Sequence, residues 1–437
     1  MKEISPELCF NLGVALSGTA RGVYAVGYDV RLTSPLLAKS FANGLNAGGS
    51  DALFLGLAPT PAVAFYSRGK LGGAMTTASH NPPEYNGVKL FDCRGASVTQ
   101  EFYCTLLSRA ESKPAMAEWL SLGSIRTGEG LHRYIEATAS LPLRKKWKVA
   151  IDPGNGATSI TAPMAMALAG CAAHHINLAP DGRFPGRGSE PHEKALAQLS
   201  GLVAAKGLDA GFAFDGDGDR VAIVDERGFP IPQDVALAFV ASRAIKNRGG
   251  GCAVVNVDTS AIVDIMVESA GGKVCRCKVG DVYILEDLLK LSGVFGGEAC
   301  GAWIFPERSL CPDGVLSALV FLALLEEEGL KPSQIGEGLP RLYLTRRKVP
   351  CPISLKRSIM ESFKSRAPST FKGSEITDID GIRLAMADKS WVLVRPSGTE
   401  PAMRITAESS SAGVSEKLAE DSMQLIKEIM GERPRKQ

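Results

Sequence analysis

Apolar segments of strand length recur along this chain, and most of them are separated by segments long enough to form a helix. This alternation builds mixed or parallel sheets covered by helices. At the start of the chain, Ser5 and Pro6 are typical of the first positions of a helix, which is predicted over 5–20. A terminal helix is predicted over 415–430. The predicted strands are 23–29, 52–57, 88–91, 148–152, 211–214, 253–257 and 293–295.

The composition places limits on the class of protein. A length of 437 residues is enough for about three domains, and a hydrophobic content of 45% can fill several cores. A net charge of +2 gives no case for binding nucleic acid or a membrane surface. No signal peptide is visible, and no apolar run reaches the roughly 18 residues that a membrane-spanning helix needs. The 10 cysteines include no CxxC pair, which favours reduced thiols in a cytoplasmic protein.

The stretch 76–91 reads TTASHNPPEYNGVKLF, in which Ser79 and His80 precede a rigid turn with two prolines. The prolines stop regular structure and leave the loop few alternative conformations. A serine hydroxyl on such a loop, with His80 beside it and Lys89 downstream, suits nucleophilic or phosphoryl-transfer chemistry. An ordinary turn rich in Ser, Asn and Pro explains the same residues, so both interpretations stay open for this stretch alone.

A second motif, AFDGDGDR, occupies 213–220 and leads into an apolar run. Asp215, Asp217 and Asp219 alternate with glycines, so the backbone can aim all three carboxylates at one point. Such carboxylates repel one another unless they share a hard divalent cation. The spacing is similar to that of a calcium-binding EF-hand, but Arg220 stands where that loop requires Gly. A solvated acidic turn is the other alternative.

Near the end of the chain, 394–401 reads VRPSGTEP, and an arginine follows shortly after it. Guanidinium groups, hydroxyls and a glycine-bearing backbone together offer hydrogen-bond donors to a phosphate dianion. A surface turn with incidental charges is the alternative. The candidate donors are Arg395, Ser397, Gly398, Thr399 and Arg404.

These three motifs resemble, in the same order, the active-site serine loop, metal loop and phosphate-binding loop of the α-D-phosphohexomutases, archaeal-type branch. Between the last two, 295–305 reads FGGEACGAWIF and is similar to the family's sugar-recognition loop, GGExSGH in its commonest form. Cys300 and Ala302 replace the family's Ser and His. The resemblance implies that Glu298 accepts hydrogen bonds from sugar hydroxyls and that Cys300 lies at the same site. Taken alone, this motif is weak, and it is better explained as a glycine-rich turn between strands.

The resemblance implies three similar mixed-sheet α/β domains and a smaller C-terminal α+β domain, with the active site in the central cleft. The serine loop would belong to domain 1–140 and the metal loop to domain 141–248. The sugar-recognition loop would belong to domain 249–347, and the phosphate-binding loop to domain 348–437.

The activity that the resemblance implies is that of a phosphohexose mutase. Ser79 would carry a phosphoryl group that converts hexose 1-phosphate to 6-phosphate, and the reverse, through a bound hexose 1,6-bisphosphate. Lys89 and His80 would shuttle protons or stabilise charge, and Arg220 would steady the phosphoryl group. Small-molecule sugar phosphates would be the partners of a monomer or homodimer. One Mg²⁺ per subunit would be held by Ser79, Asp215, Asp217 and Asp219.

Three questions stay open at this point. The RPSGTEP form, with Gly398, resembles that of phosphoglucosamine mutases, which favours glucosamine phosphate over mannose or glucose phosphate. A catalytically silent sugar-phosphate-binding protein and a metal-dependent phosphatase are alternatives. Family members usually open with a GTxGxRG string whose arginine reaches the active site. The chain begins just after the place of that string, so the resemblance leaves the activity of this polypeptide in question.

Overall fold

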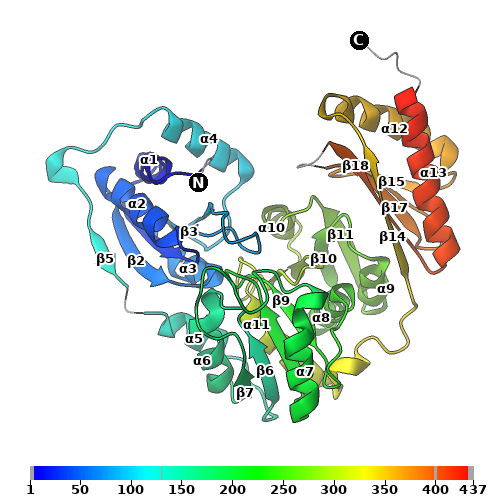
Figure 1. The fold of residues 1–437 in the computed structure, drawn as a ribbon, viewed down its shortest axis with the longest axis horizontal. Coiled ribbons are helices and arrows are strands. Elements are labelled where there is room, and N and C mark those ends of the chain that lie inside the picture. Colours follow the sequence, from blue (N-terminus) through cyan, green and yellow to red (C-terminus); the bar gives the residue numbers. More distant parts are fainter. Residues whose placement is uncertain (1–3, 129, 398–400, 432–437) are drawn as a thin grey trace.

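The structure is a computed structural model that describes residues 4–128, 130–397 and 401–431. Within these ranges the strands form four sheets, which follow one another along the chain (Figure 1). Three sheets combine parallel and antiparallel pairs, and the fourth is antiparallel throughout. The predicted fold class, three similar α/β domains followed by a smaller α+β domain, is therefore confirmed.

The first domain contains a sheet of order β4-β3-β1-β2-β5. Its first helix begins as predicted, because the Ser5 side chain accepts a hydrogen bond from the Leu8 backbone N–H and Pro6 follows it. The strands are β1 (Val23–Tyr28), β2 (Asp51–Leu57), β3 (Gly72–Thr76), β4 (Val88–Phe91) and β5 (Ile125–Thr127). The helices are α1 (Pro6–Ser17), α2 (Ser34–Ala47), α3 (Thr60–Ser67), α4 (Gln100–Glu111) and α5 (His132–Thr138).

The second and third domains repeat this order without the last strand. The second has β6 (Lys148–Asp152), β7 (Ala172–His175), β8 (Ala210–Phe214), β9 (Val221–Val224), α6 (Ala162–Leu168) and α7 (Ala197–Lys206). The strands of the third are β10 (Gly251–Asn256), β11 (Gly272–Cys277), β12 (Phe295–Gly297) and β13 (Trp303–Ile304). Its helices are α8 (Gln233–Arg248), α9 (Ala261–Ser269), α10 (Asp281–Lys290) and α11 (Gly314–Glu328).

The shared topology gives three of the predicted motifs the same place in the fold. In each of the first three domains the first strand lies inside the sheet, parallel to the second and third, and the fourth runs antiparallel to the third. The serine loop joins β3 to β4, the metal loop joins β8 to β9, and the glycine-rich loop with Glu298 joins β12 to β13. These loops are therefore structurally equivalent, although their sequences differ.

The fourth domain is an antiparallel sheet of order β14-β18-β17-β16-β15, and α12 and α13 pack against it (Figure 1). The predicted phosphate-binding loop joins β17 to β18, and its residues Gly398 and Thr399 lie outside the described residues. The predicted terminal helix is present as α13. The elements are β14 (Tyr343–Pro350), β15 (Glu375–Asp378), β16 (Ile382–Ala385), β17 (Trp391–Pro396), β18 (Ala402–Ser409), α12 (Lys356–Thr370) and α13 (Ala412–Gly431).

We propose different positions for two of the domain boundaries. The sequence placed one near 248, but α8 precedes that point and packs against α9 and β10 of the third domain. The sequence placed another near 347, which falls inside β14, a strand of the fourth sheet. We therefore propose boundaries near 140, 231 and 342.

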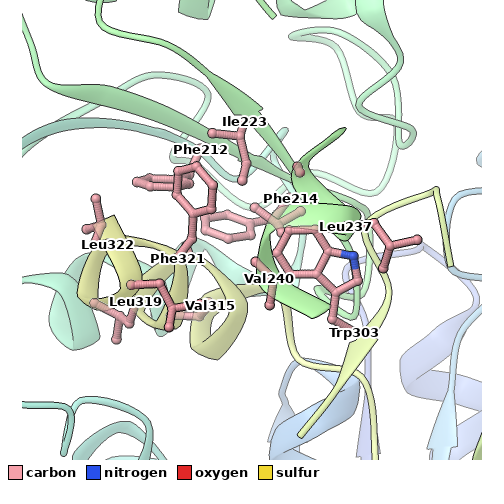
Figure 2. Packing of buried hydrophobic residues seen from close by; sticks show 14 of the residues in the cluster. Phe212, Phe214, Ile223, Leu237, Val240, Trp303, Val315, Leu319, Phe321 and Leu322 are labelled. Carbon is pink, nitrogen blue, oxygen red and sulfur yellow. The ribbon is translucent and has the colours of Figure 1, made fainter. Parts of the chain in front are cut away.

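Helix α11 connects the cores of the second and third domains. Its Phe321 ring packs edge-on against Phe212 of β8 and Phe239 of α8, and both contacts belong to one buried cluster (Figure 2). Trp303 of β13 and Leu237 of α8 belong to the same cluster. None of the helices within the described residues combines the length and apolar character needed to cross a membrane.

Two of the cysteines lie close together. Cys252 and Cys275 stand on neighbouring strands, a contact that the sequence analysis did not predict. The physical reason is the pairing of their strands. β10 and β11 are parallel neighbours, and Cys275 lies opposite Val254, two residues along from Cys252. The Cα atoms of the two cysteines are 6.4 Å apart, within the range that a disulfide can bridge.

The contact between the second and third domains predicts that Gly301→Ala is destabilising. Gly301 has φ +88°, and a Cβ there would overlap the carbonyl group of Val221, whose N–H donates to the Gly301 carbonyl. We expect a loss of roughly 2–3 kcal/mol in the free energy of unfolding, measured by denaturant titration. Gly329→Ala is the matched control, because Gly329 also has a positive φ but no atom within 4 Å of the added Cβ. It should cost only about 1 kcal/mol. Equal losses would contradict the steric argument.

Candidate active site

Ser79 lies three residues after β3 in a backbone conformation that serine rarely adopts. Its φ is +49°, and the residue is 8% exposed. The Ser79 backbone N–H donates to Thr77 Oγ1 at 2.9 Å, which fixes the turn on which the hydroxyl stands. A non-glycine residue in this conformation is an observation that favours a functional role for the loop.

Arg31 holds the serine loop in place, a role that the sequence analysis did not assign to it. Its side chain is fully buried, and Asp29 accepts from its Nε at 3.0 Å. The guanidinium donates to the backbone carbonyl groups of Ser79 and Asn81, both at 2.7 Å, and also to those of Pro82 and Tyr85. The sequence offers only an Asp-x-Arg pattern after a strand as a signal for this role. That pattern also occurs at exposed positions of the chain, so it does not single out Arg31.

Asp215, Asp217 and Asp219 converge as predicted. The carboxylates are at most 6% exposed, and one oxygen from each lies within 4.8 Å of the others. Asp217 Oδ1 and Asp219 Oδ1 are buried without a hydrogen-bond partner. Buried carboxylate oxygens need a donor or a cation. The cluster is therefore a candidate metal site, and its all-oxygen donor set fits a hard divalent cation.

The serine and the carboxylates come from different domains and are in direct contact. Ser79 Oγ donates to Asp215 Oδ2 at 2.8 Å. Lys89 of β4 reaches the same cluster, and its Nζ donates to Asp217 Oδ2 at 2.8 Å and to Asp219 Oδ2 at 2.6 Å. The structure therefore brings together Ser79, Lys89 and all three aspartates of the predicted site.

The close packing of these charged side chains shifts their pKa values. Burial, followed by repulsion from Asp219 and Asp217, raises the pKa of Asp215. Burial also raises the pKa of Asp219. Burial by itself would raise the pKa of Asp217. The charge and hydrogen bond of Lys89 have the larger effect and hold that pKa below its ordinary value. Likewise, burial works against the charge on Lys89, yet Asp217 and Asp219 raise its pKa well above the usual value. Lys89 is therefore a fixed cation in this geometry.

His80 lies beside the serine, and Arg220 lies beside the aspartates. His80 Nδ1 is 3.4 Å from Ser79 Oγ. Burial and the charge of Arg220 lower the pKa of His80, so its ring is neutral at neutral pH. The Arg220 side chain is 3.8 Å from Asp219 Oδ1, and its backbone N–H donates to Asp215 Oδ1 at 3.2 Å.

Glu298 sits in the structurally equivalent loop of the third domain. Its Oε1 accepts from Asn256 Nδ2 at 2.9 Å and from the Gly280 N–H at 3.1 Å. The Cys300 thiol points to the other oxygen, Oε2, at 3.7 Å. Burial raises the pKa of Cys300 to about 12, so Cys300 is a neutral thiol and a weak donor. Asn256 is a further residue of this loop region that the sequence analysis did not identify.

The described part of the phosphate-binding loop lies in a basic region of the fourth sheet. Arg395 of β17 pairs with Arg404 of β18, which in turn pairs with Lys348 of β14. Directly paired residues present their side chains on the same face, so these three cations form a row. Beside them, Lys356 Nζ donates to the Ser397 carbonyl group at 2.5 Å. The sequence analysis did not identify Lys348 and Lys356, since both lie far from the motif along the chain.

Comparison with known protein families gives a match for each of the four domains. The phosphoglucomutase/phosphomannomutase family matches as alpha/beta/alpha domain I over 1–115, domain II over 132–228 and domain III over 232–343. The C-terminal domain of the same family matches over 346–425.

Curated relatives and solved structures agree with this assignment. The chain is 39% identical to "Probable phosphoglucosamine mutase" of Pyrococcus abyssi, over 98% of this chain and 96% of that protein. It is 36% identical to the protein of the same name from Thermococcus kodakarensis, over 99% and 96%. The structure of a phosphoglucomutase/phosphomannomutase family protein from Burkholderia thailandensis superposes with a TM-score of 0.87 and 25% identity, over 99% and 95% of the two chains.

A more distant solved structure shares the fold alone. The N-acetylphosphoglucosamine mutase of Aspergillus fumigatus, in complex with GlcNAc-6P and magnesium, has a TM-score of 0.59 and 16% identity, over 85% of this chain and 92% of that one. Four domain matches over most of the chain, together with full-length relatives, establish the family. The chain belongs to the phosphoglucomutase/phosphomannomutase family, and it is a phosphohexomutase of the isomerase class.

The contacts of Arg31 predict that Arg31→Lys lowers turnover about 10- to 100-fold. Lysine keeps a charge for Asp29 but cannot reach the carbonyl groups of the serine loop together, so Ser79 loses its fixed position. Turnover and the melting temperature are both measured. Arg94→Lys is the matched control, because Arg94 binds Asp92 with the same Asp-x-Arg geometry at an exposed site. Unchanged turnover in Arg31→Lys would show that the serine loop holds its position without Arg31.

Proposed function

We propose that this enzyme interconverts glucosamine 1-phosphate and glucosamine 6-phosphate, with Ser79 as the carrier of the phosphoryl group. The hydrogen bond from Ser79 Oγ to Asp215, at 2.8 Å across two domains, carries the proposal. It places a serine hydroxyl on a preformed loop next to a cluster suited to a divalent cation. Positioning and charge neutralisation are what phosphoryl transfer requires of a protein.

Asp215, Asp217 and Asp219 are proposed to hold one Mg²⁺ together with the Ser79 oxygen. When bound, the ion would neutralise charge on the phosphoryl group and on the oxygen that leaves. The three buried carboxylates would hold the ion, and the Oδ1 atoms of Asp217 and Asp219, which lack a hydrogen-bond partner, would be available to it.

In the transfer step, the bond between phosphorus and Ser79 Oγ breaks while a bond forms between phosphorus and a sugar hydroxyl oxygen. The sugar hydroxyl gives up its proton, and Ser79 Oγ finally regains one. His80 is proposed as the group that moves these protons, because it is neutral and its Nδ1 lies 3.4 Å from Ser79 Oγ. Lys89 remains charged and is proposed to stabilise the transferring group, together with Arg220.

The sugar has to be recognised in two orientations, because the phosphate returned to Ser79 is the other one of the bound 1,6-bisphosphate. Glu298 is proposed to accept hydrogen bonds from the sugar hydroxyls, with Cys300 beside it. The basic row is proposed to bind the phosphate that is not reacting, and this proposal extends to Gly398 and Thr399 of the same loop. The proposed phosphate ligands with described positions are Arg395, Ser397 and Arg404.

Glucosamine phosphate is proposed as the substrate for two reasons. The RPSGTEP motif has the form found in phosphoglucosamine mutases, and the curated relatives at 35–39% identity bear that name.

The residues of the proposed active site come from four domains. We propose that these domains enclose the sugar phosphate in a central cleft.

The proposal predicts turnover of glucosamine 6-phosphate that depends on Ser79. Coupled assays compare glucosamine, mannose and glucose phosphates, and we expect the highest kcat/KM with glucosamine phosphate. Ser79→Ala should abolish turnover and remove one phosphate from the intact mass, while the circular dichroism spectrum is unchanged. Near-normal turnover of Ser79→Ala would rule out the carrier role. Binding without turnover would indicate a silent binder, and release of free phosphate would indicate a phosphatase.

The metal site predicts a second outcome, for Asp217→Asn. The amide removes one anionic ligand, so turnover should fall about 100-fold or more and recover only partly at high Mg²⁺. Asp225→Asn is the matched control, since Asp225 is 2% exposed and follows β9 but binds Arg227 instead of the cluster. Turnover is measured against Mg²⁺ concentration in both variants. The same Mg²⁺ dependence in Asp217→Asn and wild type would contradict a ligand role for Asp217.

A further inference from the structure

A hollow of about 570 Å³ lies between the third and fourth domains, away from the serine loop and the metal loop. Its walls on one side come from α9 and β11, and on the other from β15, β16 and the turn that follows them. The phosphohexomutase activity described above uses none of these residues.

Arg383 of β16 stands on the wall of this hollow and is only 6% exposed. Its guanidinium stacks on the Trp391 ring, 4.8 Å from the ring centre. Its Nε is buried without a hydrogen-bond partner, and no ion pair within the described residues reaches its guanidinium. A buried arginine with an aromatic neighbour but no acceptor retains much of its desolvation cost.

Arg276 of β11 brings a second cation to the same hollow. Asp264 accepts from both of its terminal nitrogens at 2.7 Å, whereas its Nε is also buried without a partner. Burial and then the charge of Arg276 lower the pKa of Arg383 to about 9. Arg383 therefore lines the hollow without a hydrogen-bonded anion, and Arg276 adds a second positive charge to the lining.

The acidic groups nearby are engaged or exposed. Asp264 is bound to Arg276, and Glu268 on the same wall binds Lys389 at 2.8 Å. Glu408 accepts from the Trp391 indole and from the Ala261 N–H, both at 2.8 Å. Glu375 lies on the wall but is exposed. Arg383 is thus left without a compensating hydrogen-bonded anion.

We propose that this hollow binds a small oxyanion, a phosphate or carboxylate group, between Arg383 and Arg276. Such a group accepts charge-assisted hydrogen bonds from the terminal guanidinium nitrogens of Arg383 and is attracted by the positive charge of Arg276. Because the walls belong to two domains, a bound anion stabilises the contact between the third and fourth domains. The site is separate from the basic row at Arg395 and does not depend on the proposed function.

The test measures the melting temperature of the full chain in sodium phosphate and in sodium malonate, each against sodium chloride of equal ionic strength. We expect at least one of the two anions to raise it by on the order of 2 °C at millimolar concentrations. The phosphate and malonate arms show which oxyanion the hollow prefers. Arg383→Met keeps the stem over Trp391 and removes the donors, so at least half of this rise should be lost.

Two controls separate this site from other effects. Arg357→Met removes one positive charge from an exposed position of the same domain and should keep the full rise. Arg395→Gln alters the proposed phosphate-binding row. This variant should keep the part of the rise in melting temperature that depends on Arg383. A full rise in Arg383→Met, or an equal rise in chloride, overturns the proposal.

A crystal of the unmodified protein soaked in the more effective anion gives a measurement that no variant can confound. We expect density within hydrogen-bond distance of the Arg383 guanidinium group. A hollow that holds only water under these conditions also overturns the proposal.

Discussion

The metal loop is the point at which the first three domains are joined. Backbone hydrogen bonds link it to each neighbour. Thr60 of the first domain donates to the Asp217 carbonyl group, and Gly314, at the start of α11, donates to the Gly218 carbonyl group. Main-chain contacts on both sides therefore hold the shape of the loop, independently of its side chains. A change in the packing of any one domain would move the carboxylates relative to Ser79.

Charge balance is the second constraint on the site. Three buried carboxylates cannot all ionise without a cation, and the structure supplies one in Lys89. Two carboxylate oxygens still lack a hydrogen-bond partner, which distinguishes this cluster from a closed structural ion pair. The pairing favours His80 over Lys89 as the proposed proton carrier. Lys89 is tied to the carboxylates and stays charged, while the neutral His80 has the freedom to exchange a proton.

The sequence predicted the order of the loops and most central strands, because apolar runs and Gly-Asp motifs report on local structure directly. It did not predict β3 as a strand, since Gly72, Gly73 and Ala74 have little strand propensity. Their small size has a tertiary cause, as a Cβ on Gly73 would overlap the Ser67 hydroxyl group. Contacts between distant segments were also missed. Arg31 reaches the serine loop from about 50 residues away, and no local pattern shows that.

The fourth domain differs from the others in how it reaches the site. Glu408 joins it to α9 through the Ala261 N–H, and Lys389 joins it to Glu268, so its fixed contacts are with the third domain. Its basic row lies at the other end of β17 from Trp391, which binds Glu408. Trp391 and Arg395 both belong to β17, so the contact with the third domain and the basic row lie on one strand of six residues.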